Sequence, residues 1–183
     1  EVRNRMVARR RERMKAIQLT FQDADDQDYF VDPQSSVGVM SWGATASIAR
    51  EAIDQMREQG WRISFFFPSV LWPMPDQALE RFLASGIRLL FVCELNSTRQ
   101  FGKMIRARYT TDLIEHDIRV IGITKDTGLP FTAAEIRECI LKHVSEDLSR
   151  SGVLPFSSKT IRERIFGPTP EESRVRSTAG ERP

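Results

Sequence analysis

Two polar residues that could take part in chemistry follow the third apolar run of the chain, residues 87–92. They are Glu94 and Asn96, in the segment CELNSTRQF. In a parallel α/β sheet the carboxyl ends of the strands gather binding groups, so a carboxylate beside an amide could hold a ligand here. The same residues have a structural interpretation, in which Asn96 or Ser97 caps the next helix and Glu94 belongs to a hydrogen-bonded turn. The sequence alone leaves both open.

A second candidate site is the turn at Gly43, in the segment VGVMSWGATASIAREAIDQM. A dinucleotide fingerprint needs three glycines, and this segment contains only Gly38 and Gly43. No Gly-Lys-Ser/Thr triplet exists in the chain, which excludes a P-loop. A helix that begins after Gly43 could still hold a small anion on its first amides, with Thr45 or Ser47 assisting. The alternative is that Thr45 only caps this helix.

Metal-binding and catalytic patterns are not found in the sequence. The acidic segment at residues 23–32 lacks the glycine and glutamate of a calcium loop, because Asp28 and Gln34 occupy those positions. Cys93 and Cys139 are too few and too far apart in sequence for a Cys-x-x-Cys metal site or an iron–sulfur cluster. Neither histidine comes with a nucleophile-elbow motif. We therefore predict no catalytic residue and no metal ligand in this chain.

Composition and charge restrict the class of protein. With 183 residues, of which 40% are hydrophobic, the chain can bury one ordinary core. No apolar run is long enough to cross a bilayer, and the arginine-rich start lacks the apolar block of a signal peptide, so we expect a cytoplasmic protein. The formal net charge of +2 does not favour a nucleic-acid partner, and the arginines of residues 1–16 have no interleaved aromatic residues.

The elements that would position these residues alternate regularly between residues 37 and 148. Almost continuously apolar runs predict strands at 37–42, 62–67, 87–92 and 118–123, and helical periodicity predicts helices at 45–59, 76–84, 97–109 and 132–148. A proline-rich loop covers residues 68–75. This pattern is typical of a three-layer α/β fold around a mostly parallel sheet of four strands, or five if residues 29–32 add an edge strand.

The chain divides into four segments by composition. Residues 1–20 predict a basic helix with a thin apolar stripe, formed by Val2, Met6, Met14 and Ile17. Residues 21–36 predict an acidic linker, and residues 37–148 the α/β domain. Residues 149–183 predict a polar tail, within which SSKTIRERIFG could form a short helix.

Four segments in order resemble a known family. They are SWGAT, LWPMP, CELNSTRQF and TGLPFTAAEI, one after each predicted strand. Together they resemble the C-terminal domain of the alpha subunit of 2-oxoacid:ferredoxin oxidoreductases, whose familiar members act on 2-oxoglutarate and pyruvate. The resemblance covers roughly residues 35–148 and implies a fold similar to the C-terminal domain of transketolase. The match rests on Gly43, Pro73, Pro75, Glu94, Asn96, Gln100, Gly128, Pro130, Phe131 and Thr132.

The resemblance also implies a function. In the family a 2-oxoacid is decarboxylated on thiamine diphosphate with magnesium, electrons pass through iron–sulfur clusters to ferredoxin, and an acyl-coenzyme A forms. The ligands of those cofactors lie mainly in other domains or subunits. We therefore expect a non-catalytic assembly domain that contacts upstream domains and a beta subunit, with exposed Trp72 and Phe131 as anchors. The alternative is a free-standing regulatory or small-anion-binding α/β domain.

One residue departs from the family pattern. The family usually has glycine before the glutamine of the third segment, where this chain has Arg99 before Gln100. A long cation at a helix start blocks close approach of a backbone and adds charge, so we expect contacts at this turn to differ.

Overall fold

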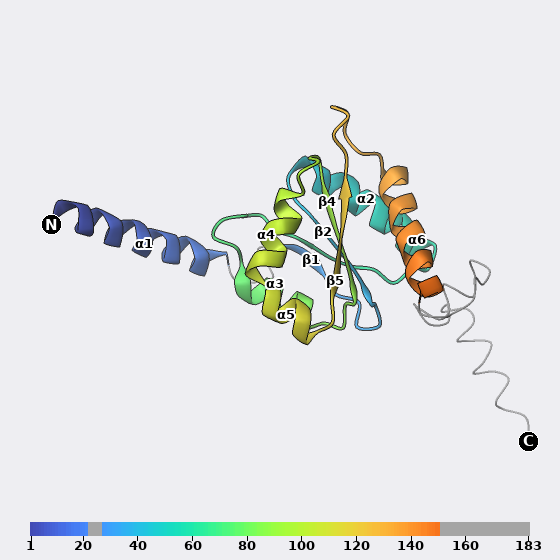
Figure 1. Ribbon diagram of the computed structural model, residues 1–183, viewed down its shortest axis with the longest axis horizontal. Coiled ribbons are helices and arrows are strands. Elements are labelled where there is room, and N and C mark those ends of the chain that lie inside the picture. The colour runs from blue at the N-terminus through green and yellow to red at the C-terminus, as the bar shows by residue number, and fades with distance from the viewer. Residues whose placement is uncertain (22–26, 151–183) are drawn as a thin grey trace, which may run out of the picture.

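The computed structural model describes residues 1–21 and 27–150, and the side chains of residues 1–21 and 27–147. The elements in chain order are α1 Val2–Thr20, β1 Asp28–Phe30, β2 Val37–Ser41, α2 Ala44–Glu58, β3 Ser64–Phe67, α3 Asp76–Leu83, β4 Leu89–Glu94, α4 Gln100–Arg108, α5 Thr110–Glu115, β5 Arg119–Thr124 and α6 Ala133–Arg150 (Figure 1). The prediction of a short helix within residues 157–167 lies outside the described residues.

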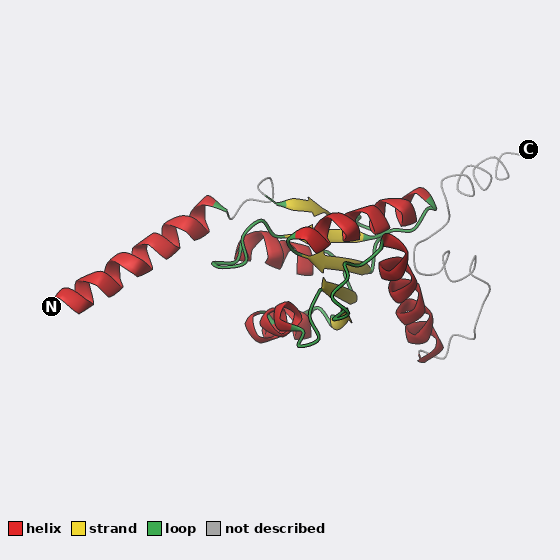
Figure 2. Cartoon of the chain, turned by 90° about the horizontal axis from the view of Figure 1, so that it is seen from above, coloured by secondary structure: helices red, strands yellow, loops and turns green. Residues whose placement is uncertain are grey.

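The strands form one five-stranded sheet in the order β1-β3-β2-β4-β5. The pairs β3–β2, β2–β4 and β4–β5 are parallel, and β1 pairs antiparallel with β3. Helices cover both faces of the sheet, as the view from above shows (Figure 2). The predicted α/β class, the mostly parallel sheet and the short edge strand are therefore confirmed.

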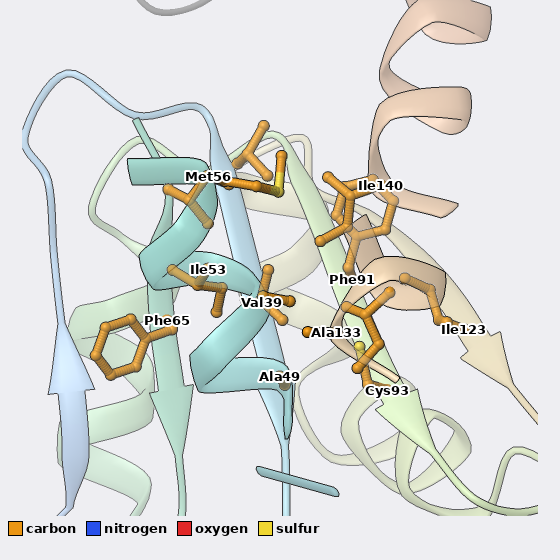
Figure 3. Packing of buried hydrophobic residues seen from close by; sticks show 14 of the residues in the cluster. Val39, Ala49, Ile53, Met56, Phe65, Phe91, Cys93, Ile123, Ala133 and Ile140 are labelled. Atoms are coloured by element: carbon orange, nitrogen blue, oxygen red, sulfur yellow. The ribbon is translucent and has the colours of Figure 1, made fainter. Parts of the chain in front are cut away.

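Each face of the sheet has its own hydrophobic core. Under α2 and α6, buried residues include Val39, Ile53, Phe65, Phe91 and Ile140 (Figure 3). The other face packs against α3, α4 and α5. Every residue of β2, β3 and β4 is buried, as expected when helices cover both faces of a parallel sheet.

Two local predictions were wrong. The predicted helix at 97–109 begins only at Gln100 and ends at Arg108, and the short helix α5 follows it. The chain interrupts the helical pattern at Arg99, which has the left-handed values φ 55° and ψ 47°, and at Tyr109, which has φ −110° and ψ 31°. Thr45 does not cap α2, because it lies buried within the first turn and Gly43 is the N-cap residue.

Helix α1 extends away from the domain (Figure 1), and none of its residues is buried. Val2, Met6 and Val7 are exposed, and only residues near its C-terminal end, such as Met14 and Ile17, are half-buried. The N-terminal part of the predicted apolar stripe therefore does not pack against the domain. Within residues 1–21 and 27–150, no helix combines the length and apolarity that a membrane span requires.

Candidate functional site

The turn between β4 and α4 is organised by a buried carboxylate. Glu94 ends β4 and is 1% exposed. Its carboxylate accepts hydrogen bonds from the backbone N–H of Phe101 at 2.9 Å and of Gly102 at 3.0 Å, which belong to the first turn of α4. The side-chain amide of Asn96 donates a third hydrogen bond to it at 2.8 Å. The carboxylate therefore serves the helix start, where the amide groups favour negative charge.

Asn96 completes this turn, although the N-cap residue of α4 is Arg99 and not Asn96 or Ser97 as the sequence suggested. Its carbonyl oxygen accepts hydrogen bonds from the Gln100 N–H at 3.3 Å and from the Thr98 hydroxyl at 3.1 Å. Asn96 thus contributes to capping α4, and Glu94 belongs to a hydrogen-bonded network. Three acceptor positions of Glu94 are already used and its side chain does not face solvent, so this carboxylate is poorly placed to act as a general base.

An ion pair between Lys125 and Glu135 bridges the two ends of the loop between β5 and α6. Lys125 Nζ donates to both carboxylate oxygens of Glu135, at 2.7 and 2.9 Å, and to the carbonyl oxygen of Pro130 at 2.9 Å. Glu135 also accepts from the Thr132 N–H, and the Thr132 hydroxyl accepts from the Glu135 N–H, which together form a capping box. The hydrogen bond from Lys125 holds the pKa of Glu135 below its ordinary value.

A pocket of about 520 Å³ lies between these two loops. It is lined by Leu95, Asn96, Ser97, Lys125, Asp126, Gly128, Leu129 and Pro130. Gly128 makes the turn with φ 77°, and Leu95 and Leu129 are exposed. The expectation that Phe131 is an exposed anchor was wrong: its ring is 6% exposed and joins the core under α2 and α6.

The turn at Gly43 adjoins a second pocket of about 490 Å³. Gly43 has φ 59°, a conformation that glycine adopts readily. Arg50 is the cation of this pocket, and it already forms ion pairs with Asp28 and with Asp54, the latter at 3.1 Å. The same guanidinium lies 4.3 Å from the centre of the Phe65 ring. Since this cation is already paired, the pocket gives no support to the anion-binding interpretation of the turn.

The proline loop begins beside the Gly43 pocket, which Pro68 and Ser69 line, and residues 72–75 lie farther away. Pro73, Met74 and Pro75 are buried and anchor the loop, whereas Trp72, joined to Pro73 by a cis peptide bond, is 63% exposed. The guanidinium carbon of Arg108 is 5.3 Å from the Trp72 ring centre. Arg108 ends α4, at the opposite end from the Glu94 turn. The structure therefore separates Trp72, with Pro73 and Pro75, from Glu94 and Asn96.

Sequence reasoning missed the polar cluster beside Trp72. Asp76, the first residue of α3, accepts hydrogen bonds from Arg108 Nε and Nη2 at 2.9 and 2.6 Å and from the Tyr109 hydroxyl at 2.5 Å. The side-chain amide of Gln18, near the end of α1, also donates to it at 2.5 Å. The only sequence signal was an acidic residue at a predicted helix start, because all of these partners are distant in sequence.

Electrostatics at this cluster favour the ionised carboxylate. Partial burial by itself raises the pKa of Asp76, but the hydrogen bonds from Arg108 and Tyr109 outweigh it and hold the pKa below its ordinary value. Burial, together with the Asp76 carboxylate, raises the pKa of the Tyr109 hydroxyl. The ionised Asp76 side chain therefore connects α3 to Gln18 of α1 and to Arg108 and Tyr109, where α4 meets α5.

No metal centre is formed by the described part of the chain: it contains no group of three or more His, Cys, Asp or Glu residues placed to hold an ion. Burial raises the pKa of the Cys93 thiol, which makes it a poor nucleophile. Cys139 is half-buried, and burial also raises its pKa.

Comparison with known proteins gives three consistent results. The profile of the family "Pyruvate:ferredoxin oxidoreductase core domain II" matches residues 35–142. The alpha subunit of 2-oxoacid:ferredoxin oxidoreductase 2 from Aeropyrum pernix is 26% identical over 135 residues, which cover 74% of this chain and 20% of that subunit. A solved 2-oxoglutarate:ferredoxin oxidoreductase from Magnetococcus marinus, with 2-oxoglutarate, coenzyme A and succinyl-CoA bound, is 27% identical with a TM-score of 0.61. That match covers 78% of this chain and 23% of the solved chain, so the present chain spans only a small part of both relatives.

Proposed function

Because the chain belongs to the pyruvate:ferredoxin oxidoreductase core domain II family, we propose that it is a structural and assembly domain of the alpha subunit of a thiamine-diphosphate-dependent 2-oxoacid:ferredoxin oxidoreductase. The whole complex would oxidatively decarboxylate a 2-oxoacid to an acyl-coenzyme A and pass the electrons to ferredoxin. The task of this chain would be to join the catalytic parts, with upstream domains and a beta subunit as its partners.

The observation that carries this proposal is the contrast in exposure between Trp72 and the predicted polar site residues. Glu94 is buried, and the Asn96 side chain serves the turn. Trp72 is 63% exposed on a loop anchored by buried proline and methionine residues, and a cation lies against its ring. A large aromatic side chain held in one place at little entropic cost is typical of the energetic centre of a protein interface.

The donor groups of the described residues do not fit thiamine diphosphate. The cofactor's diphosphate is held with a divalent cation, and no cluster of acidic, histidine or cysteine residues among residues 1–21 and 27–150 could ligate one. We therefore assign thiamine diphosphate, magnesium and the iron–sulfur clusters to other parts of the complex. Calorimetry of the chain with thiamine diphosphate or coenzyme A should show no tight binding, and tight binding would contradict the assembly role.

The assembly role is tested by placing a charge at Trp72. Trp72→Glu should weaken association with the remaining parts of the oxidoreductase about tenfold or more, because the change removes an apolar anchor and buries a carboxylate. Co-purification and analytical ultracentrifugation measure this. Ile114→Glu is a matched control, since Ile114 is 74% exposed but has no ring to stack on a cation. Normal assembly of the Trp72→Glu variant would count against the proposal.

A further inference from the structure

The edge of the sheet formed by β5 is open within the described part of the chain. β5 pairs with β4 alone, and it lies between α4 and α6 in Figure 1. In contrast to β2, β3 and β4, most of its residues are half-buried or exposed. An open edge presents backbone donors and acceptors to which another extended segment can pair.

The backbone of β5 shows which residues face this open edge. The Arg119 N–H donates to the Arg88 carbonyl at 2.8 Å, so Arg119 faces β4. Since successive residues of a strand direct their amide groups to opposite sides, Val120, Gly122 and Thr124 face away from β4. Arg106 donates to the Val120 carbonyl oxygen at 2.6 Å, and that oxygen has a second lone pair for another donor.

The side chain of Arg99 is held across this strand. Its Cδ, Nε and Cγ atoms lie 3.1, 3.3 and 3.7 Å from the position that a Cβ atom on Gly122 would occupy. The backbone of Arg99, just before α4, is left-handed, with φ 55°. Gly122 thus leaves the space through which the Arg99 side chain passes. Its backbone carbonyl accepts the Lys103 N–H at 2.8 Å, but the exposed Arg99 side chain forms no hydrogen bond and no ion pair with the residues that the structure describes.

Two further cations continue along the same side of α4. Lys103 and Arg106 are three residues apart and share one face of α4, and Arg99 precedes the helix with its side chain beside Gly122 of β5. We refer to Arg99, Lys103 and Arg106 as the α4 basic stripe. Lys103 is exposed and, like Arg99, has no ion pair within the described residues. Within the helix, Lys103 and Arg106 are separated by a rise of about 4.5 Å.

We propose that the open edge of β5 and the α4 basic stripe together bind an extended acidic segment of a partner polypeptide, which adds to the sheet beside β5. Main-chain hydrogen bonds to Gly122 and Thr124 would hold the segment, as in other cases of strand addition. Side chains on one face of a strand recur about every 6.6 Å, a spacing that the long side chains of Arg99 and Lys103 can match. Acidic residues at alternate positions would therefore meet successive cations.

The partner's chemistry follows from the size and charge of this surface. A single phosphate or carboxylate cannot reach three cations spread over two helical turns, and it would leave the backbone of β5 unpaired. The chain's own segment 151–183 contains more basic than acidic residues, so charge does not favour it as the occupant. This surface is separate from Trp72, so the inference goes beyond the proposed assembly contact and can succeed or fail independently of it.

The experiment uses the full 183-residue chain and a short fluorescent peptide in which Glu alternates with Val. Fluorescence anisotropy should show saturable binding that weakens as salt is raised. Arg99→Gly and Lys103→Gln should each reduce the affinity about three- to fivefold. Glycine suits the left-handed backbone at position 99, so this variant should fold. Arg81→Gln, which removes an exposed charge on α3, is the matched control and should not change the affinity.

Two peptide variants separate strand addition from charge attraction alone. Replacing Glu by Gln removes the charges, and N-methylation of alternate amides removes the backbone donors, so each should abolish most binding. The proposal is overturned if the N-methylated peptide binds as well as its parent, or if Arg81→Gln weakens binding as much as Arg99→Gly. It is also overturned if inorganic phosphate or phosphatidylserine vesicles bind to the stripe and the peptide does not.

Discussion

Glu94 and Asp76 are two carboxylates at the starts of neighbouring helices, α4 and α3, and their surroundings differ. The three hydrogen-bond donors of Glu94 lie within eight residues of it, and none of them is charged. Asp76 instead gathers donors 32, 33 and 58 residues away, among them the guanidinium of Arg108. The comparison shows one carboxylate that shapes a local turn and one that ties distant parts of the chain together.

Solvent exposure adds to this difference. Glu94 is 1% exposed, so removing its carboxylate leaves buried amide groups without an acceptor. The side chain of Asp76 is 20% exposed and that of Arg108 is 33% exposed, so water can replace part of their interaction. We therefore expect Glu94 to contribute more to stability than Asp76, although it accepts three hydrogen bonds and Asp76 accepts four.

The largest effect is expected at Glu94. Glu94→Ala should lower the free energy of unfolding by about 2–4 kcal/mol, because the first amides of α4 and the Asn96 side chain lose a buried acceptor. Urea denaturation followed by circular dichroism measures this loss. Glu58→Ala, at an exposed position near the end of α2, should change stability by less than about 0.5 kcal/mol. If the two variants lost equal stability, the buried hydrogen bonds of Glu94 would not be an important source of stability.

A smaller effect is expected at Asp76. Asp76→Asn should lower the free energy of unfolding at neutral pH by about 1–2 kcal/mol, because the charge-assisted hydrogen bonds with Arg108 are lost. The folded-state pKa of Asp76 is lowered, so the stabilisation is present above the unfolded-state pKa of about 3.9 and disappears as pH falls through the folded-state value. The stability difference between the two proteins should therefore shrink below about pH 4.

A double-mutant cycle tests whether this effect belongs to the Asp76–Arg108 pair. The change Arg108→Gln should cost less stability in the Asp76→Asn background than in the unmodified chain. If the losses in the free energy of unfolding were additive, Asp76 would stabilise the fold through Tyr109 or Gln18, and not through its ion pair with Arg108.

The smallest effect is expected at Arg99, between the Glu94 turn and α4. The left-handed backbone at this position disfavours any residue with a Cβ atom. Arg99→Gly should therefore be more stable than Arg99→Ala by about 0.5–1 kcal/mol, despite the greater flexibility of glycine in the unfolded chain. Thermal unfolding of the two variants measures the difference. If the alanine variant were the more stable, the backbone at the start of α4 would not be left-handed.

The local features of the fold could be predicted from the sequence. Continuous apolar runs predicted the parallel strands, and the face of α2 with Ala49, Ala52 and Ile53 is buried as its periodicity indicates. The hydrogen-bonded turn expected at Glu94 was also correct, because its partners lie nearby in sequence, but the N-cap residue of α4 is Arg99 and not the expected Asn96 or Ser97. The burial of Phe131 was not foreseen, since its packing against the core depends on where α6 meets the sheet.

The sequence by itself determined the fold class, the alternation of strands and helices along the chain, and the family. It could do so because apolar periodicity and short motifs are local properties of the chain. Only the tertiary structure decided that the proline loop lies beside the end of α4, that Asp76 connects α1 to the domain, and that Arg99 lies across Gly122. These features join residues far apart in sequence. Their energies depend on distance and burial in space, which no local pattern of residues records.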